Sequence, residues 1–167
     1  MRNNLYNWSV FVDGRGHVGE AKSITPPKLV MKIEEMMGGG MMTPVDLHLG
    51  TEKLECSITW NGQRPQSYRM FGLAPGVVIP ITCHQLLTDV SGPNQTRVTI
   101  HMRGFLRELD PGEAETQSPT NQKDEFSLNY YRRLENGVEV LEIDALLGTI
   151  RVNGVETTAS VREALMY

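Results

Sequence analysis

The chain has 167 residues, of which 40% are hydrophobic and 22% charged, and its formal net charge is −4. This length and composition predict one soluble globular domain over residues 1–167, with enough chain to bury a core. The acidic balance argues against a nucleic-acid-binding protein. No run approaches the roughly 18 apolar residues of a membrane span, and no cleavage site follows the first apolar run, so we expect neither a membrane anchor nor a secretion signal.

Apolar and polar residues alternate with a period of two along most of the chain, which is typical of β-strands. The clearest case is the segment 54–60, where Leu54, Cys56, Ile58 and Trp60 alternate with polar residues. Similar patterns begin at Tyr6, Val77, Val98 and Phe126. Asn136-Gly137 predicts a tight hairpin turn, and the slip between Val140 and Leu141 predicts a β-bulge.

Helix signals are few. Arg64 to Phe71 carries Pro65 in its first turn and is followed by Gly72, which predicts a short helix. The tail from Ser160 to Met166 is a second candidate, with Ser160 as its cap. The expected fold is mainly β, a β-sandwich or small barrel with one flanking α-helix and one long projecting hairpin.

The projecting hairpin is predicted over residues 28–49. Its first strand places Leu29, Met31 and Ile33 on one face, and its second strand alternates from Val45 to Leu49. The predicted tip holds Met37, Gly38, Gly39, Gly40, Met41, Met42, Thr43 and Pro44. Methionine adapts to an uneven surface and glycine lets backbones approach closely, so we expect this tip to be buried in a neighbouring subunit.

Residues 109–124 form the one long polar stretch without periodicity, and we expect a functional or disordered loop there. The surrounding segment 107–125 is strongly acidic, since it holds six acidic and two basic residues. Its charge accounts for the net charge of the whole chain.

Catalytic and metal-binding patterns are missing from the sequence. His17, His48, His84 and His101 have no metal-ligand spacing, although the last three could converge in space. There is no G-x-S-x-G nucleophile motif. We therefore expect no enzyme activity, no metal and no cofactor, and we expect Cys56 and Cys83 to be buried thiols.

Two other functional classes are open on the residues alone. A basic strip with an intervening tyrosine would suit a monomeric β-barrel nucleic-acid-binding module, whose members would be Arg97, Arg103, Arg107, Tyr131, Arg132 and Arg133. Ion-paired sheet faces are the alternative interpretation of the same residues. A metal-dependent barrel enzyme is the other competitor.

Several segments together resemble a known family. They are FVDG at 11–14, SITPPKL at 23–29, GGGMMTPVDLHLG at 38–50, MRGFLRELDPGE at 102–113, EVLEID at 139–144 and RVNGV at 151–155. Their order and spacing resemble the major tail tube protein of contractile-tailed bacteriophages, a family shared with the tube subunits of R-type bacteriocins. The doubled proline at Pro26-Pro27 and the methionines Met41 and Met42 depart from the family pattern.

The resemblance implies a structural subunit that forms hexameric rings, which stack into a hollow conduit for genome ejection. It implies contacts with other copies, the tail sheath protein, tube initiator or baseplate proteins and terminator proteins, and DNA passing without specific binding. The location implied is the virion tail, assembled in the bacterial host cytoplasm. Candidate lumen-lining residues are Lys32, Glu34, Asp46 and His48, on the expected polar face of the hairpin. A bacteriocin tube without DNA and, more distantly, a type VI secretion tube are the alternatives within this architecture.

Overall fold

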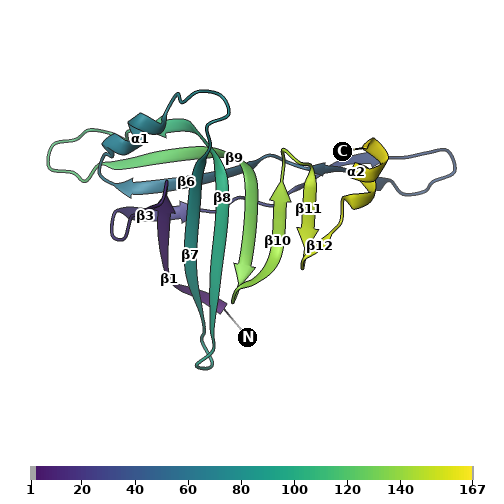
Figure 1. The fold of residues 1–167 in the computed structure, drawn as a ribbon, viewed down its shortest axis with the longest axis horizontal. Coiled ribbons are helices and arrows are strands. Elements are labelled where there is room, and N and C mark those ends of the chain that lie inside the picture. The colour runs from purple at the N-terminus through teal and green to yellow at the C-terminus, as the bar shows by residue number, and fades with distance from the viewer. Residues whose placement is uncertain (1–2, 167) are drawn as a thin grey trace.

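A computed structural model describes residues 3–166 and is mainly β, as predicted. Figure 1 shows a broad sheet with one hairpin projecting far to one side. The strands are β1 (Asn3–Val12), β2 (Arg15–Gly16), β3 (Ala21–Thr25), β4 (Met31–Met36), β5 (Val45–Thr51), β6 (Leu54–Asn61), β7 (Ile79–Asp89), β8 (Gln95–Asp110), β9 (Asn121–Glu135), β10 (Val138–Asp144), β11 (Thr149–Val152) and β12 (Val155–Glu156). The helices are α1 (Pro65–Met70) and α2 (Ala159–Leu165).

The main sheet has the order β12-β11-β10-β9-β8-β7-β1-β2, and β6 adds to it through β9 while β3 pairs with β6. The two halves of β9 have different neighbours. Residues 121–128 of β9 pair with β6, and residues 130–135 of β9 pair with residues 138–144 of β10. The long strands therefore carry the sheet from one layer into the next, and the core lies between the layers.

Gly104 permits the change of direction in β8. The β8–β9 register shifts between Arg103 and Gly104. A Cβ atom built on Gly104 would lie 2.0 Å from the carbonyl oxygen of Ser127, so no residue with a side chain fits without backbone movement. A glycine at a bulge of this kind is a regular device for bending a sheet.

The alternating patterns predicted the core well. Leu54, Cys56, Ile58 and Trp60 are all buried, and so are Val98, Ile100 and Met102 on β8. Cys56 and Cys83 are buried free thiols, as expected. On β9 the bulge at Asn129 shifts the alternation, so Tyr131 faces the core in place of Tyr130.

Both helices lie close to their predicted positions. The second begins earlier than expected, and its N-cap residue is Thr158 where we predicted Ser160. The reason is that the Thr158 hydroxyl accepts a hydrogen bond from the Ile150 backbone N–H at 3.1 Å, which fixes the start of α2 against β11. Within residues 3–166 both candidate helices form, whereas the expected architecture included one flanking helix. Neither helix in the described range 3–166 is long and apolar enough to cross a membrane.

Two local predictions are confirmed and one boundary is corrected. Asn136 and Gly137 both have positive φ, as a type I′ hairpin turn requires, and the β9–β10 register skips Val140. The acidic connection spans 111–120, shorter than the predicted 109–124, because β8 extends to Asp110 and β9 begins at Asn121. Asp124, expected in the loop, is fully buried in β9.

Candidate assembly surfaces

The hairpin of β4 and β5 has no partner within the described chain other than itself. Every residue of β4 is exposed, and only Thr51 of β5 is partly covered. Most of its large apolar side chains are between 42% and 99% exposed, namely Leu29, Val30, Met31, Ile33, Met36, Met37, Met42, Val45, Leu47 and Leu49. A contiguous apolar surface of this kind on a soluble protein marks a site of protein contact.

The tip of the hairpin is a compact turn. Its backbone closes through a hydrogen bond from the Met41 N–H to the Gly38 carbonyl at 3.1 Å, and the Gly38 N–H lies 3.2 Å from the Met41 sulfur. Gly40 has a φ of +86°, which favours glycine. Met42 is left 99% exposed, so the turn presents its side chain to solvent.

The register of the hairpin separates the four lumen candidates. Cross-strand partners share a face, and Glu34 lies opposite Leu47, whereas Asp46 lies opposite Glu35 and His48 opposite Ile33. Glu34 is therefore on the other face from Asp46 and His48, and the expected single polar face does not form. Lys32 lies at the register shift between Met31 and Ile33, which moves the two alternations out of phase.

A more uniformly polar surface covers the outer face of β7–β10, and we call it the polar wall. Its cross-strand rows include Thr82–His101–Arg132–Glu142 and Arg103–Tyr130–Asp144. Its charges are mixed: Arg132 pairs with Glu139 at 2.9 Å, and the Arg103 guanidinium stacks on Tyr130 at 4.0 Å. Burial and the charge of Arg132 lower the pKa of His101, which favours its neutral form.

In the basic strip predicted as an alternative, most of the arginines form ion pairs with carboxylates. Arg107 pairs with Glu55 at 2.7 Å and with Glu125, and Arg133 pairs with Glu135 at 2.9 Å. Tyr131 is buried and so offers no stacking surface. Within residues 3–166 no three His, Cys, Asp or Glu side chains are grouped to hold a metal ion.

A buried polar network that the sequence analysis missed fixes α1 to the core. Asp124 accepts hydrogen bonds from Trp60 Nε1 at 2.8 Å, from Ser67 of α1 at 2.5 Å and from Gln122 Nε2 at 2.9 Å. Gln122 in turn accepts from the backbone N–H of Arg64 at 2.8 Å. The sequence did contain a sign of this network. Phe126 and Leu128 alternate along β9 as buried residues, and the same alternation, continued toward the N-terminus, places Asp124 and Gln122 on the buried face.

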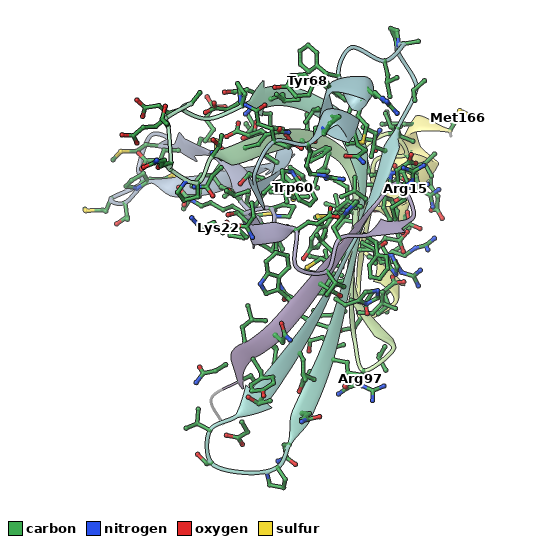
Figure 2. All side chains as sticks on the ribbon, turned by 90° about the vertical axis from the view of Figure 1, so that its left-hand side faces the viewer. Arg15, Lys22, Trp60, Tyr68, Arg97 and Met166 are labelled. Atoms are coloured by element: carbon green, nitrogen blue, oxygen red, sulfur yellow. The ribbon has the colours of Figure 1, made fainter. Side chains whose placement is uncertain are left out.

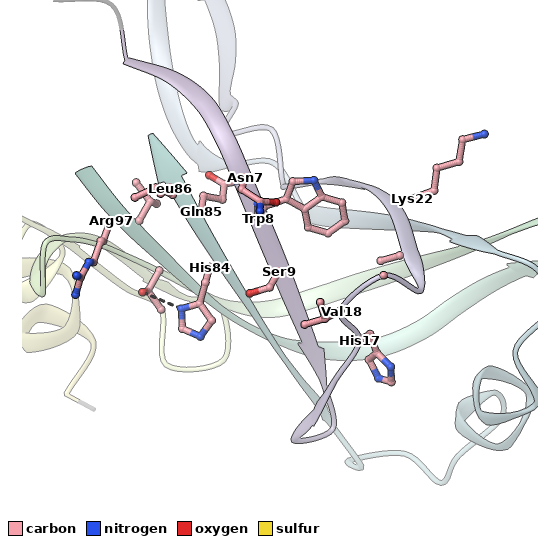
Figure 3. A pocket seen from close by; sticks show the side chains of 14 residues that line it. Asn7, Trp8, Ser9, His17, Val18, Lys22, His84, Gln85, Leu86 and Arg97 are labelled. Atoms are coloured by element: carbon pink, nitrogen blue, oxygen red, sulfur yellow. Dashed lines mark hydrogen bonds between the residues drawn. The ribbon is translucent and has the colours of Figure 1, made fainter. Parts of the chain in front are cut away.

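A cavity of about 630 Å³ lies where β1 and β7 extend past the body of the molecule. Figure 3 shows Trp8 and Ser9 on one side, His84 on another, and Lys22 on β3. His84 is within 3.2 Å of the Thr99 hydroxyl, and its ring meets Phe11 edge-on. In Figure 2 this extension, with Arg97 at its side, stands apart from the body that encloses Trp60. Because the cavity opens widely to solvent, it fits a surface for contact with another molecule better than an enclosed ligand site.

Solved structures share this fold. One is a chain of the PVC sheath–tube complex, an extracellular contractile injection system in its extended state, with a TM-score of 0.59 and 12% identity over 77% of this chain and 88% of that chain. Another is from the PVC sheath/tube terminator in the extended state, with a TM-score of 0.59 and 12% identity over 77% of this chain and 94% of that chain. These likenesses show that the two-layered sheet is a fold also found in chains of contractile injection systems.

Sequence comparison gives the family. A family model described as phage tail tube protein FII matches residues 2–165, and the chain belongs to this family. It is 32% identical to the tail tube protein of Escherichia phage P2, covering 93% of this chain and 92% of that protein. It is 30% identical to the major tail tube protein of Serratia phage KSP20, covering 83% and 81%. Such proteins are structural components of the virion tail, so the resemblance found in the sequence is confirmed.

Proposed function

We propose that this chain closes into hexameric rings with copies of itself and that the rings stack into the inner tube of a contractile phage tail. The observation that carries the proposal is the projecting hairpin, residues 28–49, whose apolar side chains are exposed on both faces. A monomer gains nothing from this surface, and a neighbouring copy would cover it. The tip from Met37 to Pro44 is then the part inserted into the neighbour.

Ring formation also answers the problem of open strand edges. The main sheet ends at β12 on one side and at β2 on the other, and β3 forms a further edge. Unpaired edges expose backbone donors and acceptors, and joining copies edge to edge around a ring removes them. A contact between two different surfaces of the same chain closes into a ring when the rotation permits.

The polar wall is the surface best suited to line the lumen of the tube. Arg132 is paired with Glu139, and Glu142 and Asp144 add acidic charge beside it, so a DNA phosphate backbone meets mixed charges with Arg103 and Arg97, among residues 3–166, as the free cations on this face. The hairpin residues Glu34 and Asp46 are the competing candidates. Replacing Glu142 and Asp144 by Lys should slow genome ejection if the wall lines the channel. Slowing by Glu34→Lys/Asp46→Lys alone would place the hairpin there.

The mechanism is mechanical and needs no catalytic group, metal or cofactor. The tube acts as a rigid conduit through the host envelope while an outer sheath contracts around it. The sheath, a tube initiator or baseplate and a terminator are the other partners we assign, with assembly in the host cytoplasm. The likeness to chains of a sheath–tube complex and of a sheath/tube terminator supports the sheath and the terminator as partners.

Deleting Gly38 to Met42 tests the self-assembly proposal. The deletion should leave a folded subunit, because none of the five residues contacts the core, and it should abolish polymers seen by negative-stain electron microscopy. Replacing residues 91–93, in the turn between β7 and β8, by Gly-Ser-Gly is the control for altering a loop elsewhere. Long tubes from the deletion variant would show that the hairpin tip is not the clasp.

A further inference from the structure

A basic cleft of about 300 Å³ opens between the β1–β2 turn and α1. Arg15 comes from β2, Arg64 from the residue before α1, and Arg69 from the last turn of that helix. Val12, Met70 and Leu73 supply apolar wall, and Asp13 is the one acidic residue among those lining the cleft. Within the described residues neither Arg15 nor Arg69 belongs to an ion pair, so the cleft carries uncompensated positive charge.

Arg64 is the buried member of this cleft. Its side chain is 7% exposed, its guanidinium lies 3.7 Å above the Trp60 ring, and Nη2 donates to His17 Nε2 at 3.0 Å. His17 Nδ1 then faces Glu20 at 2.8 Å. Among residues 3–166, no hydrogen-bond partner reaches the Nε and Nη1 atoms of Arg64, and the Glu20 carboxylate is 3.9 Å from Nε. A buried cation with two unpaired donors is costly unless an acceptor reaches it.

The chain carries the matching acidic element in the loop 111–120. Glu113 and Glu115 are exposed on it, and Glu108 and Asp110 lead into it on β8. None of the four carboxylates belongs to an ion pair in the part of the chain that the structure describes. The loop connects two long strands and so presents its charges from a fixed base. Carboxylates are acceptors that pair well with the fork of N–H donors on arginine.

We propose that the cleft of Arg15, Arg64 and Arg69 receives the acidic loop 111–120 of a second copy of this chain. The inference rests on the proposed self-assembly and adds a polar contact to the apolar one made by the hairpin. Because cleft and loop are different surfaces, the contact joins copies head to tail. The charge pairs set the orientation of neighbours and speed their encounter, and the hairpin supplies the apolar area.

Charge reversal in two separate chains tests this pairing. One variant carries Arg15→Glu and Arg69→Glu, and the other carries Glu113→Arg and Glu115→Arg. Arg64 is left intact because it packs on Trp60. Each variant alone should associate about tenfold more weakly or worse, since like charges then meet across the contact. Mixed in equal amounts, the two should associate again, because each cleft then faces a loop of opposite charge.

Sedimentation is the readout, since it detects pairwise association as well as tubes, and far-UV circular dichroism verifies that each variant is folded. Lys22→Glu/Arg97→Glu, which makes the same change of charge outside the cleft, is the matched control and should gain nothing from the loop variant. Raising the salt concentration should weaken association of the unmodified chain.

Three results would overturn the inference. The first is a cleft variant that associates like the unmodified chain, and the second is a folded pair of variants that fails to recover on mixing. The third is a cleft variant that assembles normally but loses salt-dependent binding of a duplex oligonucleotide, which would assign the cleft to phosphate. Each of these leaves the proposed tube intact, whereas failure of the unmodified chain to associate at all would refute the proposed function itself.

Discussion

Strand β6 and the projecting hairpin have similar alternating sequences and opposite environments. The apolar residues of β6 are at most 4% exposed, because β3, β9 and the opposite layer cover them. On the hairpin, Leu29, Met31 and Ile33 are each about 50% exposed. Alternation therefore predicts that a strand has an apolar face, but it does not tell whether the cover comes from the same chain or from another molecule.

The largest effect on the contrast between core and hairpin should come from a change in the core at Asp124. Asp124→Ala leaves the buried donors of Trp60, Ser67 and Gln122 without an acceptor, so the free energy of unfolding should fall by about 3–5 kcal/mol. Urea denaturation of the monomer measures this loss. Glu113→Ala in the exposed loop should change the free energy by less than about 0.5 kcal/mol. A loss below about 1 kcal/mol for Asp124→Ala would mean that the network contributes little.

The bend in β8 gives the next largest effect. Gly104→Ala should cost about 3 kcal/mol, since its Cβ would overlap the Ser127 carbonyl and force the two strands apart. Gly92→Ala is the matched control, because a Cβ atom there meets nothing within 4 Å. Equal stabilities of the two variants, compared by thermal unfolding, would show that the bend does not depend on glycine.

Alkaline pH should weaken the core and spare the hairpin. Burial raises the pKa of Cys56 to about 12 and that of Cys83 to about 11. A thiol whose pKa is raised on folding stabilises the protein fully below its unfolded pKa, and this contribution is lost as pH rises through the folded value. Unfolding free energy should thus be constant to about pH 7.5 and fall by about 3–4 kcal/mol by pH 10, roughly half from each thiol. A Cys56→Ala/Cys83→Ala variant should show a flatter alkaline limb in denaturation curves.

The smallest effect on stability belongs to the hairpin. Met37→Ser/Met42→Ser should change the monomer's unfolding free energy by less than about 0.5 kcal/mol, because both side chains are largely exposed. The same variant should assemble poorly in electron micrographs if the tip binds a neighbour. Met102→Ser on β8 is the contrasting change, and it should destabilise the fold. A hairpin variant that unfolds more easily would mean that the tip packs on its own chain.

Patterns local in the sequence were predictable here. The buried face from Leu54 to Trp60, the Asn136-Gly137 turn and the bulge at Val140 each depend on a few adjacent residues. Register was not predictable, because pairing of Glu34 with Leu47 depends on a shift beside Lys32 that no residue pattern announces.

Buried polar residues were the other failure. Gln122 and Asp124 read as loop because their types favour solvent, yet partners distant in sequence satisfy them in the core. The basic cleft could not be predicted from the sequence for the same reason, because Arg15, Arg64 and Arg69 come together only after folding.

The placement of the methionines gives the molecule a chemical weak point at one end. Met36, Met37 and Met42 are open to solvent, while Met102 is 1% exposed in the core. Dilute peroxide would therefore convert the exposed thioethers, those of the hairpin and of Met166, to polar sulfoxides before that of Met102 and leave the fold intact. Oxidised subunits would remain folded but would lose the apolar contact on which association with neighbouring copies depends. Methionine sulfoxide reductases would reverse the oxidation and restore that contact.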